Sequence, residues 1–485
     1  MLRSVLRNFT AIGVAHIVDR AVSFLFIVYA ARELGPDVFG QYLLVGTYVM
    51  FFSITFMAGV VPVAVREIVR HRDDPGPVFE QVLSLRLVLG ILAYAMLMLI
   101  TGLVLPHATF LPLAAIAGTA LIIDAFKDSF GAYHNAFERM AIPGVFQVAN
   151  GVLTAVVGAA ALYLNVGLVT LLAACAAVNL IVTGCWHVYF YTRYQRYRIR
   201  FAVGAWKQML VMIAPIAPVQ LAAQFNRLAS VIMLSLVSGP IPTERAVGYF
   251  GPAQQVAFFP LAFLFGLRRA MVPPIAHKLH RGEPIGEVFV VALKIVVVFV
   301  SFPLLVATSL FSSEILLLVF GPKYVESSMT LMLLGAASAL WIAAIIPESL
   351  IVSYPEHKFA PLFVSMCVPL LINLTLCVVL IPIYSVAGAA FAILVARCVY
   401  VGFVLHYCRK LLPPGTLHLA RFLEPLCVLS AAYAAACLLM AQGIEQTIMQ
   451  SLAVVVIAAV AMLVAGRGEL GKLWRLVFRR HRPAA

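Results

Sequence analysis

Residues 9–31 read FTAIGVAHIVDRAVSFLFIVYAA, and residues 209–236 read MLVMIAPIAPVQLAAQFNRLASVIMLSL. Each run is long enough to cross roughly 30 Å of hydrocarbon as a helix. Each also carries one arginine deep inside it, Arg20 or Arg227. A cation at mid-bilayer costs at least about 2.5 kcal/mol on insertion scales, so it normally faces a watery cavity or a charged partner. The two runs therefore predict membrane helices that carry a functional cation site.

Apolar runs of this length continue along the whole chain. Of its 485 residues, 63% are hydrophobic and 11% are charged, and the mean hydropathy is +1.02, well above that of soluble domains. Barrel strands would be short and alternating, whereas these runs are continuous. The sequence predicts an all-α integral membrane protein with about 14 transmembrane helices. The expected spans are 9–31, 39–64, 81–105, 110–131, 142–164, 168–190, 208–237, 246–270, 287–310, 328–352, 360–382, 385–407, 420–440 and 447–466.

The basic residues between the spans predict the orientation, because lysine and arginine stay on the cytoplasmic side. With the N-terminus inside, 26 of the 34 basic residues lie in cytoplasmic connections or tails. Only Arg32, Arg245 and Lys323 lie outside. The first span lacks a small-residue cleavage site, so we expect it to be retained as a helix. Both termini are therefore expected in the cytoplasm.

The composition argues against several other kinds of site. The net charge of +14 is spread over every cytoplasmic connection, so anionic lipid headgroups are the expected partner and nucleic acid is not. The eight cysteines lie in or beside apolar spans without C-x-x-C spacing, which favours packing over metal binding. The eleven histidines form no H-x-x-x-H pattern. We expect no metal, no cofactor and no enzymatic activity.

An internal repeat relates the two halves of the chain. A shift of 207 or 208 residues superposes Arg20 on Arg227, Gly40 on Gly248, and Arg86 on Lys294. Because an even number of spans separates the copies, both have the same orientation, as in transporters whose substrate path lies between two parallel repeats. The expected divisions are a six-helix half at 1–200, a second six-helix half at 201–412, and two additional helices with a basic cytoplasmic tail at 413–485.

The seventh span contains helix breakers followed by polar residues. Pro215 and Pro218 each remove a backbone donor, which predicts a kink. The polar residues that follow are Gln220, Gln224, Asn226 and Arg227. The two glutamines and the arginine are spaced by four and three residues, so they share one helix face. We expect this stripe to contact substrate in a central cavity; the alternative is hydrogen bonding between helices alone.

Acidic residues within the spans are few. Asp19 is adjacent to Arg20, but successive side chains diverge by about 100° on a helix, so the two do not pair simply. Asp19 either neutralises a cation on a neighbouring helix or binds a coupling proton or sodium ion. Asp124, Lys127 and Asp128 lie near the cytoplasmic end of the fourth span, where we expect them to snorkel to the headgroups.

Three segments carry a family resemblance. They are RELGPDVFGQY at 32–42, LLVFGPKY at 317–324 and IPIYSVAGAA at 381–390. In these segments and in their places among the spans, the chain resembles the Wzx-type oligosaccharide flippases of the multidrug/oligosaccharidyl-lipid/polysaccharide (MOP) exporter superfamily. The resemblance covers essentially the whole chain. It departs at Ala229, where many relatives carry an acid, and at Ser385, where a glycine is common.

The resemblance implies a MATE-like fold in the inner (cytoplasmic) membrane. It also implies translocation of a polyprenyl-pyrophosphate-linked oligosaccharide from the cytoplasmic to the outer leaflet, for surface polysaccharide biosynthesis. Members typically have a cation-rich cavity, for which Arg20, Arg227, Lys294 and Arg397 are the candidates. A proton or sodium ion is the candidate coupling ion, and a polysaccharide polymerase or another assembly protein is the candidate partner.

Two other functions remain open. A multidrug/cation antiporter of the same superfamily generally needs intramembrane acids, whereas cations outnumber acids in these spans. A membrane glycosyltransferase or polysaccharide polymerase would show a sizeable extramembrane loop with catalytic motifs, whereas the longest expected connections have about 17 residues. The sequence therefore favours the flippase.

Overall fold

The computed structural model describes residues 2–104, 110–237, 239–281, 285–353, 359–412, 420–441 and 448–466. These residues are almost entirely helical and include no strand. The basic tail expected after Gly466 lies outside the described residues. The helices are α1 (Leu2–Met57), α2 (Val60–Arg70), α3 (Gly76–Val104), α4 (Phe110–Ala136), α5 (Ala141–Tyr163), α6 (Gly167–Arg193), α7 (Val203–Ile213), α8 (Ala217–Leu236), α9 (Thr243–His280), α10 (Gly286–Val296), η1 (Val297–Ser301), α11 (Phe302–Leu310), α12 (Ser312–Phe320), η2 (Pro322–Ser327), α13 (Ser328–Ser353), α14 (Phe359–Leu411), α15 (Ala420–Ala441) and α16 (Ile448–Ala465).

Every expected span overlaps a helix. Within the described ranges, 9 helices are long and apolar enough to cross a membrane. Two of them, α1 and α14, each run through two expected spans and turn at Gly35 (φ 70°) and Ser385 (φ 48°). The all-helical membrane architecture is confirmed, and the count of fourteen crossings stays a prediction.

The seventh expected span is broken where its prolines stand. The first part, α7, ends at Ile213, and α8 begins at Ala217. Pro218 occupies the first turn of α8, where a missing N–H removes no bond within the helix. The predicted kink is confirmed.

The chain divides into two compact units. The N-terminal unit comprises Met1–Gly251 with Ile381–Ser385, and the C-terminal unit comprises Pro252–Leu380 with Val386–Ala485. The expected division at 201 and 413 follows the sequence repeat and not compactness, so it stays a prediction.

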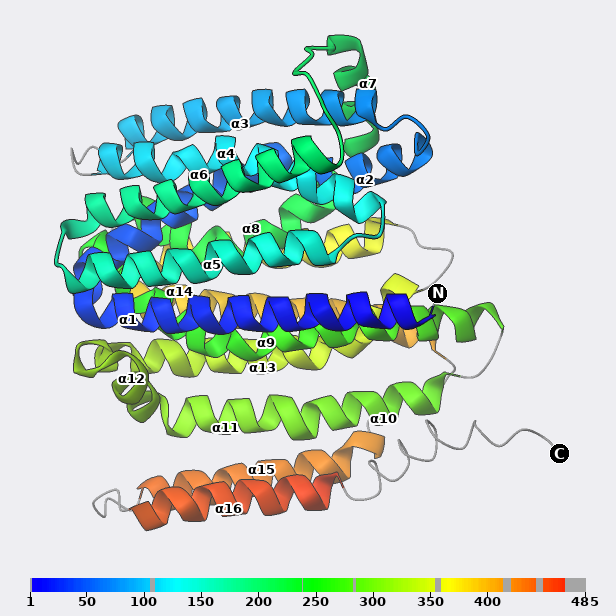
Figure 1. Cartoon of the computed structure of the whole chain (residues 1–485). Helices are drawn as coiled ribbons and strands as arrows, with labels where there is room; N and C mark the ends of the chain where they lie inside the picture. The colour runs from blue at the N-terminus through cyan, green and yellow to red at the C-terminus, as the bar shows by residue number, and fades with distance from the viewer. Residues whose placement is uncertain are drawn as a thin grey trace. The chain divides into compact units, whose positions relative to one another are not determined.

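An aromatic core holds the helices of the N-terminal unit. In this unit α3 packs against α4, α4 against α6, α6 against α5, and α5 against α1 (Figure 1). Phe79, Phe130 and Phe190 stack where α3, α4 and α6 meet, with ring centroids 4.8 to 6.2 Å apart. All three side chains are fully buried, and each such ring pair contributes about 0.5–1.5 kcal/mol beyond its buried area. This core fixes α4 and α6, which carry polar residues described below.

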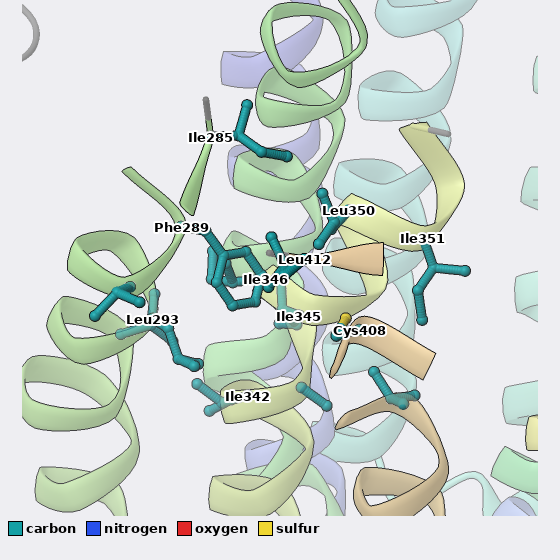
Figure 2. Close-up of a cluster of buried hydrophobic side chains, with 14 of the residues drawn as sticks. Ile285, Phe289, Leu293, Ile342, Ile345, Ile346, Leu350, Ile351, Cys408 and Leu412 are labelled. Carbon is teal, nitrogen blue, oxygen red and sulfur yellow. The ribbon is translucent and has the colours of Figure 1, made fainter. Parts of the chain in front are cut away.

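An aliphatic cluster holds the C-terminal unit. Phe289 and Leu293 of α10 pack against Ile342 and Ile346 of α13, with Cys408 from the end of α14 beside them (Figure 2). The Cys408 thiol donates a hydrogen bond to the Pro347 carbonyl oxygen at 3.2 Å. Because lipid tails are as apolar as these side chains, close packing and not hydrophobic transfer is what favours this association in a membrane.

Two glycines related by the repeat meet where α9 begins, within the N-terminal unit. A Cβ atom on Gly40 would lie 1.7 Å from the carbonyl oxygen of Glu244, and one on Gly248 would lie 1.8 Å from that of Pro36. Pro36 and Glu244 are themselves 208 residues apart, like the two glycines. The contact is therefore reciprocal, as a two-fold relation between copies requires.

An ion pair lies beside this crossing and follows the same offset. The Arg245 guanidinium donates to both carboxylate oxygens of Asp37, at 2.8 and 2.9 Å. The side chains are 46% and 50% exposed, so the pair contributes only about 0.2–1 kcal/mol. The two residues are 208 apart, which agrees with the internal repeat.

Candidate functional site

Arg20 and Arg227 both lie in the N-terminal unit, on α1 and α8. Arg20 on α1 is exposed, and Arg227 on α8 is half-buried. The part of α1 that follows its Gly35 turn contacts α8, as Tyr48 does with Ser235. The charge of Arg20 also acts on Arg227. The Arg227 Nε atom is buried and has no hydrogen-bond partner among the described residues. The two like charges therefore repel each other, and a bound anion would relieve that repulsion.

The residues that precede the two arginines make local contacts. An Asp19 carboxylate oxygen accepts a hydrogen bond from Gln147 Nε2 on α5, at 3.1 Å. Asn226 Nδ2 donates to the carbonyl oxygen of Ala222 one turn earlier, at 2.8 Å. Within the described ranges no ion pair forms at Asp19, so neither of its two expected roles is established.

One of the two predicted glutamines supports a turn. The Gln220 side-chain oxygen accepts a hydrogen bond from the Gly59 backbone N–H at 2.9 Å. Gly59 has φ 80°, a conformation that glycine adopts without steric cost, and it immediately precedes α2. Gln220 thus satisfies a free donor at the α2 N-terminus. Gln224 is half-buried on the same helix.

The other two predicted cations belong to the C-terminal unit. Lys294 is half-buried on α10. Arg397 on α14 is only 7% exposed, and its guanidinium carbon lies 3.9 Å from the centre of the Trp341 ring. The charge of Glu348, itself 2% exposed on α13, also acts on Arg397. Arg397 therefore interacts with residues of its own unit, Trp341 and Glu348.

Glu348 is a buried acid, within an expected span, that the sequence analysis did not single out. The signal was present, since Pro347 and Glu348 interrupt an apolar run. Glu348 lies near the end of the expected span 328–352, so the sequence agreed equally well with a location among the headgroups and with a buried one.

The charged residues of α4 have partners on neighbouring helices. Arg86 on α3 is 1% exposed and forms an ion pair with Asp128. The Lys127 ammonium lies 3.0 Å from Asp124 Oδ1 and donates to Asn179 Oδ1 on α6 at 2.9 Å. Helices α3 and α6 thus supply partners that sequence spacing does not reveal, and the expected position of these residues at the headgroups stays a prediction.

A cavity of about 480 Å³ lies within the N-terminal unit, among α1, α4, α5 and α6. Its polar lining includes Asp124, Lys127, Asn150, Thr154 and Asn179. The described residues contain no group of His, Cys, Asp and Glu able to hold a metal ion. The cavity is thus a mainly apolar pocket with polar groups in its lining, which the sequence did not predict.

A family model identifies the chain. Residues 5–278 match the family described as Polysaccharide biosynthesis protein, which is more than half of the chain. The chain belongs to this family. No curated protein matches it.

Solved structures show which fold this polysaccharide biosynthesis protein has. The lipid II flippase MurJ in an inward closed conformation is 14% identical, with a TM-score of 0.72 over 96% of this chain and 99% of that one. An inward-facing MATE multidrug transporter is 12% identical, with a TM-score of 0.65 over 81% and 93%. A MOP superfamily transporter from Pyrococcus furiosus is 14% identical, with a TM-score of 0.56 over 83% and 95%. These likenesses show the MOP fold and confirm the Wzx-type resemblance.

The two departures from family pattern have different structural settings. Ser385 has φ 48° and ψ −121°, which glycine adopts far more readily than serine. Its hydroxyl is buried without a hydrogen-bond partner in the described part of the chain. Ala229 is 5% exposed, and α8 contains no acid to accompany Arg227.

Proposed function

We propose that this protein translocates a polyprenyl-pyrophosphate-linked oligosaccharide from the cytoplasmic to the outer leaflet of the inner membrane. The observation that carries the proposal is the buried Arg227 Nε donor without a described partner, on which the charge of Arg20 also acts. The family supports a role in polysaccharide biosynthesis, and the fold is that of flippases and transporters.

The chemistry of the headgroup fits two guanidinium groups. A diphosphate brings negative charge that the hydrocarbon core does not solvate. Arginine meets phosphate oxygens with a planar fork of donors and keeps its charge at physiological pH. Arg227 has a buried Nε donor that no described residue uses. A bound diphosphate would satisfy that donor and offset the repulsion from Arg20.

The remaining predicted residues have secondary roles in this proposal. Gln224 and Asn226 flank Arg227 and would hydrogen-bond to sugar hydroxyls, and Gln220 would keep the α1–α2 turn in place. Lys294 and Arg397 would act as further cations in the C-terminal unit. The isoprenoid tail would remain in lipid, and a polymerase or another assembly protein would receive the sugar.

The competing functions have less support. A cation antiporter would need an accessible intramembrane acid. Glu348 is buried beside Arg397, and the partly exposed Asp19 is followed directly by the exposed cation Arg20, which disfavours a cationic substrate there. A polymerase or glycosyltransferase would need catalytic groups outside the membrane, and the connections between the described helices are short.

The test is reconstitution in liposomes with a fluorescent polyprenyl-pyrophosphate oligosaccharide, using an impermeant quencher to measure transfer between leaflets. Arg20→Ala and Arg227→Ala should each slow transfer by about 10- to 100-fold, since a hydrogen bond to a charged group contributes about 1.5–3 kcal/mol. Arg193→Ala, at an exposed position on α6, is the matched control and should transfer at the wild-type rate. Transfer by both site variants at the wild-type rate would show that the arginines do not hold the headgroup.

Imposed ion gradients address the candidate coupling ion. The same liposomes are compared with a pH gradient, a sodium gradient and neither. Acceleration by one gradient identifies the ion. If Asp19 binds that ion, Asp19→Asn should remove the acceleration while leaving the basal rate intact.

A further inference from the structure

The polar end of the N-terminal cavity is built around one ammonium group. Lys127 extends from α4, and its Nζ atom lies 3.0 Å from Asp124 Oδ1 and 2.9 Å from Asn179 Oδ1. The Asn150 side-chain oxygen of α5 is also buried and has no hydrogen-bond partner among the described residues. Three helices thus direct carboxylate and amide oxygens into one pocket.

Such a set of oxygen ligands is what a hard cation requires. Hard cations are bound by carboxylate and amide oxygens, and an ammonium group is a compact cation with three donors and no acceptor. The Lys127 and Asp124 side chains are 24% and 38% exposed, so the pair lies at the wall of the cavity and not in a sealed core. A small ion entering the cavity could therefore reach the same oxygens.

The charges around the pocket balance only while Lys127 is present. Arg86 and Asp128 form the adjacent ion pair, and Asp128 also experiences the charges of Asp124 and Lys127. The other titratable groups that line the cavity are Tyr42 and Cys175. Two cationic and two anionic side chains therefore form a neutral group. Removing the lysine leaves one excess negative charge in the pocket.

We propose that this end of the cavity is a monovalent-cation site whose resident cation is the tethered ammonium of Lys127. The N-terminal unit keeps the site filled without a free sodium ion. An alkali ion can bind to the oxygens of Asp124, Asn150 and Asn179 only when the ammonium is absent. The inference does not depend on the transported lipid.

The test measures thermal unfolding of the full-length protein in detergent. Sodium, potassium, lithium and choline chlorides are compared at equal ionic strength, with choline as the cation too large for the site. Wild-type Tm should be the same in all four salts. Lys127→Ala should have a lower Tm in choline, and Tm should rise by about 3–6 °C for each tenfold increase in one alkali ion above its Kd.

Two further variants assign the effect to this pocket. Lys127→Ala combined with Asp124→Asn removes both charges, and its Tm should not distinguish alkali ions from choline. Lys207→Ala removes an exposed lysine from α7 and should behave as the wild type. If Lys127→Ala fails to fold in choline, the same variant and Lys127→Gln should be recovered folded when alkali salt is present throughout purification.

Three results would overturn the proposal. The first is sodium stabilisation of the wild type that Asp124→Asn abolishes, because a free ion would then already occupy the site. The second is a folded Lys127→Ala protein with equal Tm in alkali and choline salts. The third is failure of both Lys127 variants to fold in every salt.

Discussion

The crossing of α1 and α9 should not accept even one methyl group. In Gly248→Ala the new Cβ would lie 1.8 Å from the Pro36 carbonyl oxygen, whereas real Cβ contacts are essentially never shorter than 3.0 Å. The backbones must therefore separate by at least about 1.2 Å, the difference between these two distances. Overpacking of this kind typically costs about 1–3 kcal/mol.

That cost corresponds to a Tm lowered by about 2–12 °C for a unit of this size. The assay is thermal unfolding of the purified protein in detergent. Gly40→Ala should cause a loss of similar size, because its Cβ would lie 1.7 Å from the Glu244 carbonyl oxygen. Gly184→Ala is the matched control, since a Cβ there meets nothing within 4 Å.

The Gly184→Ala control also shows the stability change that a glycine-to-alanine substitution causes without a clash. Alanine favours helix over glycine by about 0.5–1 kcal/mol, so Gly184→Ala should be neutral or slightly stabilising. A Gly248→Ala protein as stable as Gly184→Ala would refute the close crossing. A large loss for Gly248→Ala with none for Gly40→Ala would refute its reciprocity.

Two further predictions concern buried charge and backbone strain. Asp128→Leu should lower Tm more than Arg86→Met, because it leaves the fully buried Arg86 guanidinium unpaired, whereas Arg86→Met leaves a half-exposed carboxylate. The double variant should recover most of the loss caused by Asp128→Leu, and additive losses in a double-mutant cycle would argue against the pair. Ser385→Gly should raise the free energy of unfolding by about 1 kcal/mol, since residue 385 has φ 48° and the serine hydroxyl is buried without a described partner. A fall in Tm would contradict the interpretation that the backbone is strained at Ser385.

The fold could be predicted from features that are visible in the sequence alone. Continuous apolar runs of about twenty residues specify helices without reference to any neighbour. Pro215 and Pro218 specify the break between α7 and α8 through their missing donors. The offset of 208 residues placed Gly40 and Gly248 in equivalent positions, and the structure brings them to one crossing.

The candidate site was predictable only in part. The repeat marked Arg20 and Arg227 as equivalent, and in the structure the charge of Arg20 acts on Arg227. The partners of Arg86, Lys127 and Gln220 were not predictable. Several membrane helices, such as α3 and α6, are apolar on nearly every side, so their sequences do not reveal which face meets a neighbour. A polar pair between two such helices depends on rotation, which only packing defines.

The repeat constrains the backbone more tightly than it constrains charge. Gly40 and Gly248 are both glycine because either side chain would strike a backbone oxygen of the opposite copy. Charges obey no such condition. Arg86 has Asp128 on α4, whereas residues 336–346 of α13, which lie 208 to 218 residues after Asp128, contain no acid. A change at either crossing glycine should therefore disturb both copies equally. A change at Lys127 or Asp128 should disturb the N-terminal unit, because the charged groups that contact these two side chains lie in that unit.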